Sequence, residues 1–150
     1  GITFAGSRQS LDTGAKMVHL APDTTSLITT KSVSKGGGEG YFRSAIYIAK
    51  EAERSKTSVS CASLMLDSES RSDTIPAMEI LNDNVDVGHE AKIGRISSDA
   101  IFYLMSRGIS EDEARSMIVS GFAIPVSKEL PLEYAVEMNN LIRLEMKGTM

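Results

Sequence analysis

The 150-residue chain has no tryptophan, and aromatic residues make up only 5% of it. Small and β-branched residues carry the apolar content instead, which favours an elongated, regularly layered core over a large globular one. Hydrophobic residues at 41% and charged residues at 24% are ordinary for a globular protein. The length allows one sizeable core, or a core with a small appendage.

Cysteine is nearly absent as well, because Cys61 is the single one in the chain. A lone cysteine cannot form an internal disulfide, so the sequence predicts a reducing, cytoplasmic setting. It also excludes a zinc or iron–sulfur site built from several cysteines of this chain alone.

Long apolar runs and basic clusters are missing too. No run approaches the roughly 20 apolar residues that a membrane-spanning helix needs, and no secretory signal opens the chain. The net charge is −4 and no stripe of Lys and Arg is present, which argues against nucleic-acid binding. The chain opens at Gly1 without an initiator Met, so we expect it to be a segment of a longer protein.

Short strand-like runs, broken by Gly, Ser, Asp and Asn, fill the first two-thirds of the chain. Their regular spacing is typical of a β-sandwich, a β-barrel or a parallel β-helix, and the residues alone leave these three open. The runs are AKMVHL (15–20), TSLITTKSVS (25–34), RSAIYIA (43–49), TSVSCASLMLD (57–67), IPAMEIL (75–81) and VDVGHEAKI (85–93).

The hydrophobic period changes from strand-like to helical after Ser97, which predicts a β body over residues 1–97 and a three-helix subdomain over 98–150. The first helix, AIFYLMSR (100–107), ends before Gly108. It is apolar nearly all round, so it needs cover from other helices or from a partner.

Capping signals define the other two helices. Ser110 with Glu113 forms a capping box, and the helix that it opens is predicted to run to about Ser120 and to be closed by Gly121. The third helix follows Pro131. Its predicted apolar stripe consists of Leu130, Tyr134, Met138, Leu141 and Ile142.

Two residues with ionisable side chains, His89 and Glu90, are consecutive in the last strand-like run. Neighbouring side chains of a strand point to opposite faces, so the two cannot serve one small site from the same side unless a bulge intervenes. Gly88 is a plausible place for such a bulge. Without one, His89 shares the apolar face with Val87, whereas Glu90 shares the polar face with Lys92.

Taken alone, the candidate residues have unremarkable explanations. Cys61 lies two residues after Val59 and therefore on the same face of the strand, which predicts a buried position. A lone Cys is also more often a core residue than a reactive thiolate. A lone His on an apolar face is likewise more often a hydrogen-bonded core residue, and His19 is interpreted as structural. The glycine cluster at 36–38 lacks phosphate-loop spacing and precedes a strand, so it predicts a turn.

Enzymatic alternatives find little support in the residues. A cysteine protease would pair Cys61 with a histidine, but no orienting Asn or Asp can be identified. A β-helix enzyme such as a polysaccharide lyase would line one groove with several charged residues, and no such set is found.

In combination, however, the motifs resemble the C-terminal part of the SufB/SufD family, the scaffold proteins of the SUF iron–sulfur cluster assembly machinery. The similarity runs in order along essentially the whole chain. It includes FAG (4–6), GAKMVHLAPDTTS (14–26), TKSVSKGGG (30–38), YFR (41–43), SRSDTIPAMEI (70–80), GHEAKIGRIS (88–97), FYLMSRGISEDEA (102–114), MIVSGF (117–122) and ELPLEYAVEMNNLI (129–142).

The resemblance implies a right-handed parallel β-helix followed by a helical subdomain. It points to the B-type member, because the D-type paralogue generally lacks the cysteine and resembles His-Gly-Ala where this chain has His89-Glu90-Ala91. By this resemblance Cys61, His89 and Glu90 are candidate ligands of iron, cluster or sulfide at an interface with a second scaffold subunit. A separation of 28 residues between Cys61 and His89 would fit neighbouring coils.

The resemblance also implies partners. The expected function is a non-enzymatic scaffold that works with the SufC ATPase, with a SufD-type paralogue or a second copy, and with sulfur donor and cluster acceptor proteins. A SufD-like structural subunit without a cluster ligand is the alternative. The cofactor that the resemblance implies for the scaffold is a transient iron–sulfur cluster in the full assembly, and reduced flavin in the full complex stays open. The candidate ATPase-docking residues are Phe102, Tyr103, Met105, Arg107, Leu130 and Tyr134.

Overall fold

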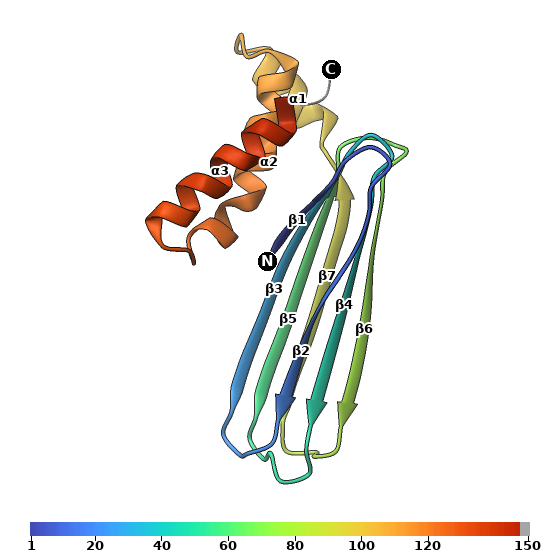
Figure 1. The fold of residues 1–150 in the computed structure, drawn as a ribbon, viewed down its shortest axis with the longest axis vertical. Coiled ribbons are helices and arrows are strands. Elements are labelled where there is room, and N and C mark those ends of the chain that lie inside the picture. The colour runs from blue at the N-terminus through green and yellow to red at the C-terminus, as the bar shows by residue number, and fades with distance from the viewer. Residues whose placement is uncertain (148–150) are drawn as a thin grey trace.

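The computed structural model of the chain describes residues 1–147, in which strands come first and helices last (Figure 1). The strands are β1 (Ile2–Ala5), β2 (Ser10–His19), β3 (Thr25–Ser34), β4 (Glu39–Ile48), β5 (Lys56–Met65), β6 (Arg71–Ile80) and β7 (Asp86–Arg95). The helices are α1 (Ser98–Met105), α2 (Glu111–Ser127) and α3 (Leu132–Lys147).

The strands alternate between two parallel sheets, one ordered β1-β3-β5-β7 and the other β2-β4-β6. Within each sheet a strand pairs with the strand one coil later, as Thr25 does with Lys56 and Ser10 with Glu39. A chain that returns to the same sheet in parallel after two strands forms a β-helix. The parallel β-helix is therefore confirmed, and the antiparallel alternatives are excluded.

The glycine cluster makes the turn between β3 and β4. Gly36 and Gly37 have φ angles of +60° and +76°, which residues other than glycine rarely adopt. Gly38 allows a close backbone approach instead, because a Cβ there would lie 2.4 Å from the Ala5 carbonyl oxygen. The predicted turn is confirmed, and its glycines are needed for the coil to close.

The interior between the two sheets is apolar along most of its length. Its buried residues include Ile28, Ile46, Ile48 and Val59. His19 is also buried, and its two ring nitrogens lie 2.6 Å from the Thr24 hydroxyl oxygen and 2.8 Å from that of Ser26. Both nitrogens of His19 thus have partners, which confirms its structural interpretation.

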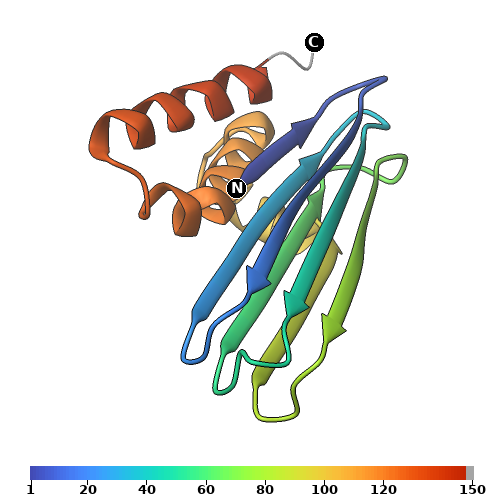
Figure 2. The ribbon, with the colours of Figure 1, turned by 60° about the horizontal axis from the view of Figure 1, so that its bottom comes forward.

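The helices pack at one end of the strands, against the outer face of the β1-β3-β5-β7 sheet (Figure 2). Val119, Ala123 and Ile142 from the helices form a second core with Val33 and Leu66. Arg115 of α2 adds a hydrogen bond of 3.1 Å from Nη1 to the Leu66 carbonyl oxygen. None of the helices in the described part is long and apolar enough to cross a membrane.

The prediction that Gly121 ends the second helix is wrong. α2 continues through Gly121 and Pro125 to Ser127. The helix continues because Val119 and Ala123 on either side of the glycine are buried against the β-helix, and this packing outweighs the roughly 1 kcal/mol cost of a helical glycine. The Ser110 cap is confirmed, since its hydroxyl accepts from the Glu113 amide at 3.3 Å.

The apolar stripe predicted on α3 is only partly covered. Ile142 is buried and Met138 is partly buried, and both belong to or pack against the core that joins the helices to the sheet. Tyr134 and Leu141 lie on the same face of the helix but are exposed. The prediction of burial is therefore correct only for Met138 and Ile142.

Candidate functional site

Cys61 lies in the middle of β5 with its side chain directed into the β-helix. It is 3% exposed and belongs to the same core cluster as Val59 and Phe42. The burial predicted from strand parity is confirmed. The thiol is thus held by a rigid strand and surrounded by apolar side chains.

His89 lies on β7, the strand directly after β5 in the sheet. Its register partner is Val59, so its side chain points to the same inner face as the thiol two residues along. The His89 Nε2 atom lies 4.0 Å from the Cys61 Sγ atom. The predicted juxtaposition of the two strands on successive coils is confirmed.

The position of β7 makes the histidine accessible. β7 is the last strand of its sheet, and β6 is the last strand of the facing sheet. No further coil in the described residues covers these two strands, so His89 is exposed although its side chain points inward. The imidazole therefore stands between the buried thiol and the surroundings at an open edge.

Glu90 faces away from this pair. The register between β5 and β7 runs without interruption over ten residue pairs, so the bulge suggested at Gly88 is absent. Glu90 points to the outer face, where its carboxylate lies 2.8 Å from the Lys92 ammonium group. Among the described residues, no group of three or more His, Cys, Asp and Glu side chains could hold one metal ion.

Two rows of register partners surround the site. Thr30, Cys61 and Ala91 form the inner row, and Lys31, Ala62 and Lys92 form the next row on the outer face. Lys31 also lies over the Phe122 ring of α2, 4.2 Å from its centroid. Burial, with a smaller contribution from the Lys92 charge, lowers the pKa of Lys31.

Sequence reasoning did not select these lysines. A usable signal exists nonetheless: residues spaced by 30 or 31 positions share a row of the β-helix, as Lys31, Ala62 and Lys92 do.

A cavity of about 340 Å³ lies inside the β-helix and is lined by Thr13, Thr30, Ser63 and Thr74 among others. Cys61 does not line it.

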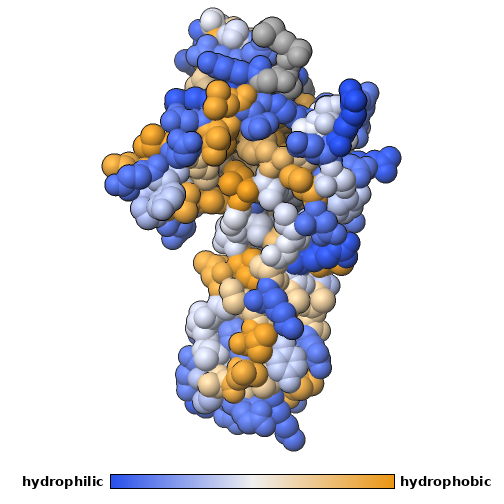
Figure 3. Space-filling view, in the orientation of Figure 1, coloured by the Kyte–Doolittle hydropathy of each residue, from blue (hydrophilic) through white to orange (hydrophobic). Residues whose placement is uncertain are grey.

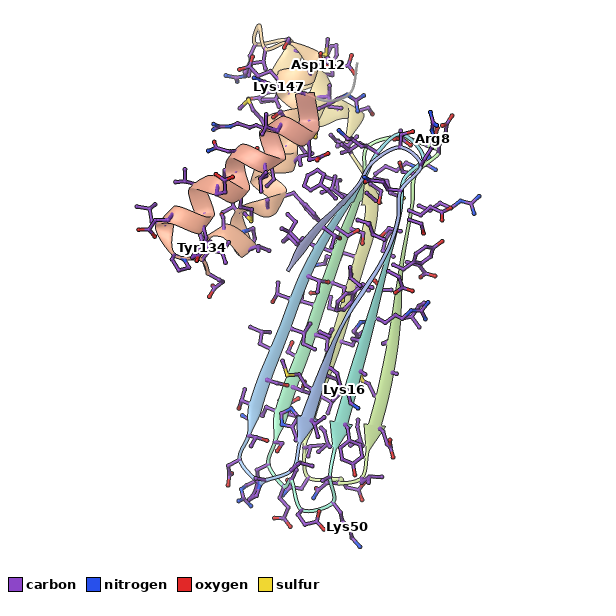
Figure 4. The ribbon with its side chains drawn as sticks, viewed as in Figure 1. Arg8, Lys16, Lys50, Asp112, Tyr134 and Lys147 are labelled. Carbon is purple, nitrogen blue, oxygen red and sulfur yellow. The ribbon has the colours of Figure 1, made fainter. Side chains whose placement is uncertain are left out.

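The docking residues predicted on the helices are exposed but do not form one surface. Phe102 is 74% exposed, and Tyr103 and Met105 of α1 are also exposed. The Arg107 guanidinium carbon lies 4.6 Å from the Tyr103 ring centroid, so these two residues lie together. Leu130 precedes α3, and Tyr134 lies at the end of that helix remote from Lys147 and from α1 (Figures 1 and 4).

Comparison with known proteins agrees with the geometry. Residues 1–122 match the family described as "SUF system FeS cluster assembly, SufBD core domain". The chain belongs to the SufBD family. It is 53% identical over 148 residues to the iron–sulfur cluster assembly protein SufB of Bacillus subtilis (strain 168). SufBD family proteins of Staphylococcus haemolyticus and Staphylococcus epidermidis show the same identity over the same length.

The family assignment made from the motifs is thereby confirmed. The match covers 99% of the chain but only 32% of each of these three relatives, so the chain spans about a third of their length.

Proposed function

We propose that this SufBD family chain is the part of a scaffold subunit that holds a nascent iron–sulfur cluster at a subunit interface. The observation that carries the proposal is the Cys61–His89 pair, with 4.0 Å between sulfur and nitrogen, at an open edge of the β-helix. The Cys61 thiol is buried, and the neighbouring His89 imidazole is exposed at the unpaired edge of the sheet. A second chain that binds at this edge would therefore lie close to both groups.

The chemistry of the pair suits an iron–sulfur cluster as cargo. Thiolates are the usual protein ligands of such clusters, and imidazole replaces thiolate in some of them. Cys61 would provide a thiolate ligand to the cluster iron, and His89 would provide a second ligand or accept the thiol proton. Since four protein ligands are usual and the pair supplies two, further ligands would come from the partner side.

Glu90 takes a separate role in this proposal. Because it lies on the outer face with Lys92, it does not join the same coordination sphere from the same chain. Glu90 would contact the partner subunit at the interface, or the Glu90 of a second subunit would serve as a ligand.

The helical subdomain would dock the SufC ATPase. Phe102, Tyr103 and Met105 of α1 are exposed, and Arg107 lies over the Tyr103 ring. Aromatic, Met and Arg side chains of this kind are enriched at interface hot spots. Leu130 and Tyr134 lie too far along the helical part to join this group, so they would form a second contact.

A SufD-like structural subunit that holds no cluster is the competing proposal. It would need neither the thiol nor the imidazole at the edge. The 4.0 Å approach of these two groups therefore favours the cluster-holding role.

Replacement of the thiol tests the proposal. In Cys61→Ser, cluster reconstitution under anaerobic conditions should yield clearly less bound iron and acid-labile sulfide than in the parent protein, because the hydroxyl is a poor cluster ligand. Ser60→Ala, one residue away on the outer face, is the matched control and should load normally. Unchanged iron and sulfide in Cys61→Ser, with an unchanged circular dichroism spectrum, would remove the ligand role.

A further inference from the structure

The contact between His89 and Cys61 runs diagonally across the two strands that carry them. The register sets His89 beside Val59, two residues before the cysteine, and sets Ala91 beside the cysteine itself. With strands about 4.8 Å apart and a rise of about 3.3 Å per residue, the Cβ atoms of His89 and Cys61 are roughly 8 Å apart. The His89 Nε2 atom nevertheless lies 4.0 Å from the Cys61 Sγ atom. The imidazole therefore leans along β7 toward the thiol.

The space into which the imidazole leans belongs to position 91. The inward side chains of β7 alternate along the strand and are those of Val87, His89, Ala91, Ile93 and Arg95. Ala91 has the smallest side chain of the five. Its methyl group leaves room for the ring beside the thiol, whereas a branched side chain at this position would fill the same room.

Core packing does not account for the small residue at position 91. The small residues that a close-packed interior selects are buried, as Ala49 and Ala52 are, but Ala91 is exposed. Alanine is also less favourable in a strand than valine or isoleucine. Neither interior packing nor the stability of the strand therefore explains the alanine.

No other polar contact holds the His89 ring in place. Both ring nitrogens of His19 have hydroxyl partners, whereas among the described residues the His89 ring has no hydrogen-bond partner besides the Cys61 sulfur. A side chain held by so little takes the rotamer that its neighbours on the same face leave open. The size of the residue at position 91 consequently decides whether the imidazole reaches the thiol.

We propose that Ala91 is a positioning residue of the Cys61–His89 pair. Its short side chain admits the imidazole to the space beside the thiol, so that sulfur and nitrogen can bind the same metal ion. Metal–sulfur and metal–nitrogen bonds of about 2.3 and 2.0 Å together span up to about 4.3 Å, which accommodates the observed 4.0 Å. The inference rests on the proposed function, because it concerns the geometry of the same site, and Ala91 itself contributes no ligand atom.

Cobalt(II), a spectroscopic stand-in for iron(II), tests the inference in the full-length protein. Its thiolate complexes show a charge-transfer band in the near ultraviolet, and Cys61→Ser serves as the blank. In Ala91→Leu the dissociation constant for cobalt should rise about tenfold, as in His89→Ala, because the isopropyl group takes the place of the imidazole. In the combined variant Ala91→Leu/His89→Ala it should rise no further, since both substitutions remove the same ligand.

Matched variants separate this role from a general effect on the strand. Ala91→Ser keeps a short side chain and should bind cobalt like the parent protein, as should Ala77→Leu, the same change at an exposed position of β6. Ala91→Val, which suits a strand, provides the same test with a smaller expected loss. Circular dichroism checks the fold of each variant.

Parent-like cobalt binding by folded Ala91→Leu and Ala91→Val would overturn the inference, as would losses that add in full in the combined variant. A parent protein without the cobalt–thiolate band would overturn it as well, since the pair would then hold no metal. Iron and sulfide loading is a separate readout. If loading depends on Cys61 while cobalt binding is indifferent to the residue at position 91, the role of Ala91 falls and the proposed function stands.

Discussion

Asp67 illustrates how one side chain closes a coil. Its carboxylate accepts hydrogen bonds from the amides of Gly36 at 2.5 Å, Glu69 at 2.9 Å and Ser70 at 2.7 Å, and from the Ser70 hydroxyl at 3.0 Å. Partial burial alone would raise the pKa of Asp67, but the hydrogen bonds from Ser70, Gly36 and Glu69 outweigh it, and the pKa is lowered. The ionised carboxylate therefore joins two successive turns.

Asp67→Asn should lower the free energy of unfolding by about 1 kcal/mol at neutral pH, because the amide keeps only one acceptor oxygen and the site is partly solvated. A group with a lowered pKa stabilises the fold above its unfolded-state pKa, and this contribution is lost as the pH falls through the folded-state value. The difference between parent and variant should consequently shrink in acid. Urea unfolding at several pH values checks this, with the exposed Asp73→Asn as control; an equal difference at every pH would contradict it.

At the same scale, strand parity predicted the orientations of the site residues. Cys61 points inward and is buried, and His89 and Glu90 take opposite faces. The exposure of His89 could not be predicted, because parity gives the direction of a side chain and not whether another strand covers it.

At the scale of elements, the apolar helix α1 was expected to need cover. In the described chain α1 buries Ile101, whereas Phe102, Tyr103 and Met105 remain exposed. Apolar side chains also reach the surface elsewhere over the helices and strands (Figure 3), so exposure alone does not define a docking surface. The contact of Arg107 with the Tyr103 ring distinguishes Tyr103 from the other exposed apolar residues of α1.

We expect Tyr103→Glu combined with Met105→Glu to abolish binding of the SufC ATPase in a pull-down, because two charges would replace two of the exposed apolar side chains of α1. Leu144→Glu, an exposed change on the outer side of α3, is the matched control and should leave binding intact. Full binding by a well-folded double variant would place the docking surface elsewhere on the molecule.

Element boundaries were predictable where the signal is local. Ser110 caps α2 through a contact three residues along the chain, and Gly108, with a φ of +87°, follows α1. The end of α2 was not predictable, because it depends on packing of Val119 and Ala123 against strands that are remote in the sequence.

At the scale of the whole molecule, the helical subdomain is attached through one apolar core. Val119 is 0% exposed and packs with Val33 of β3 and Leu66 in the loop after β5. Polar contacts surround this core: the Lys35 ammonium group donates to the Glu145 carbonyl oxygen, and Arg115 donates to that of Leu66.

Val119→Ala should destabilise this attachment by about 2 kcal/mol, through two lost methyl groups and the cavity left behind. Hydrogen exchange should then accelerate in α2 and α3, while the amides of β4 and β5 inside the β-helix remain protected. Val18→Ala, at an exposed position of β2, serves as control. Equal acceleration throughout the β-helix would show that strands and helices unfold as one unit.

The sequence by itself determined the family, the alternation of inward and outward side chains and the change from strand to helix near Ser97. Each of these depends on local period or on motifs that can be compared directly. Only the tertiary structure decided that Cys61 and His89 lie 4.0 Å apart, that Glu90 is on the other face, and that β7 is left with a free edge. These facts arise from contacts between residues one coil apart, about 30 positions along the chain, and from which strand is last in its sheet.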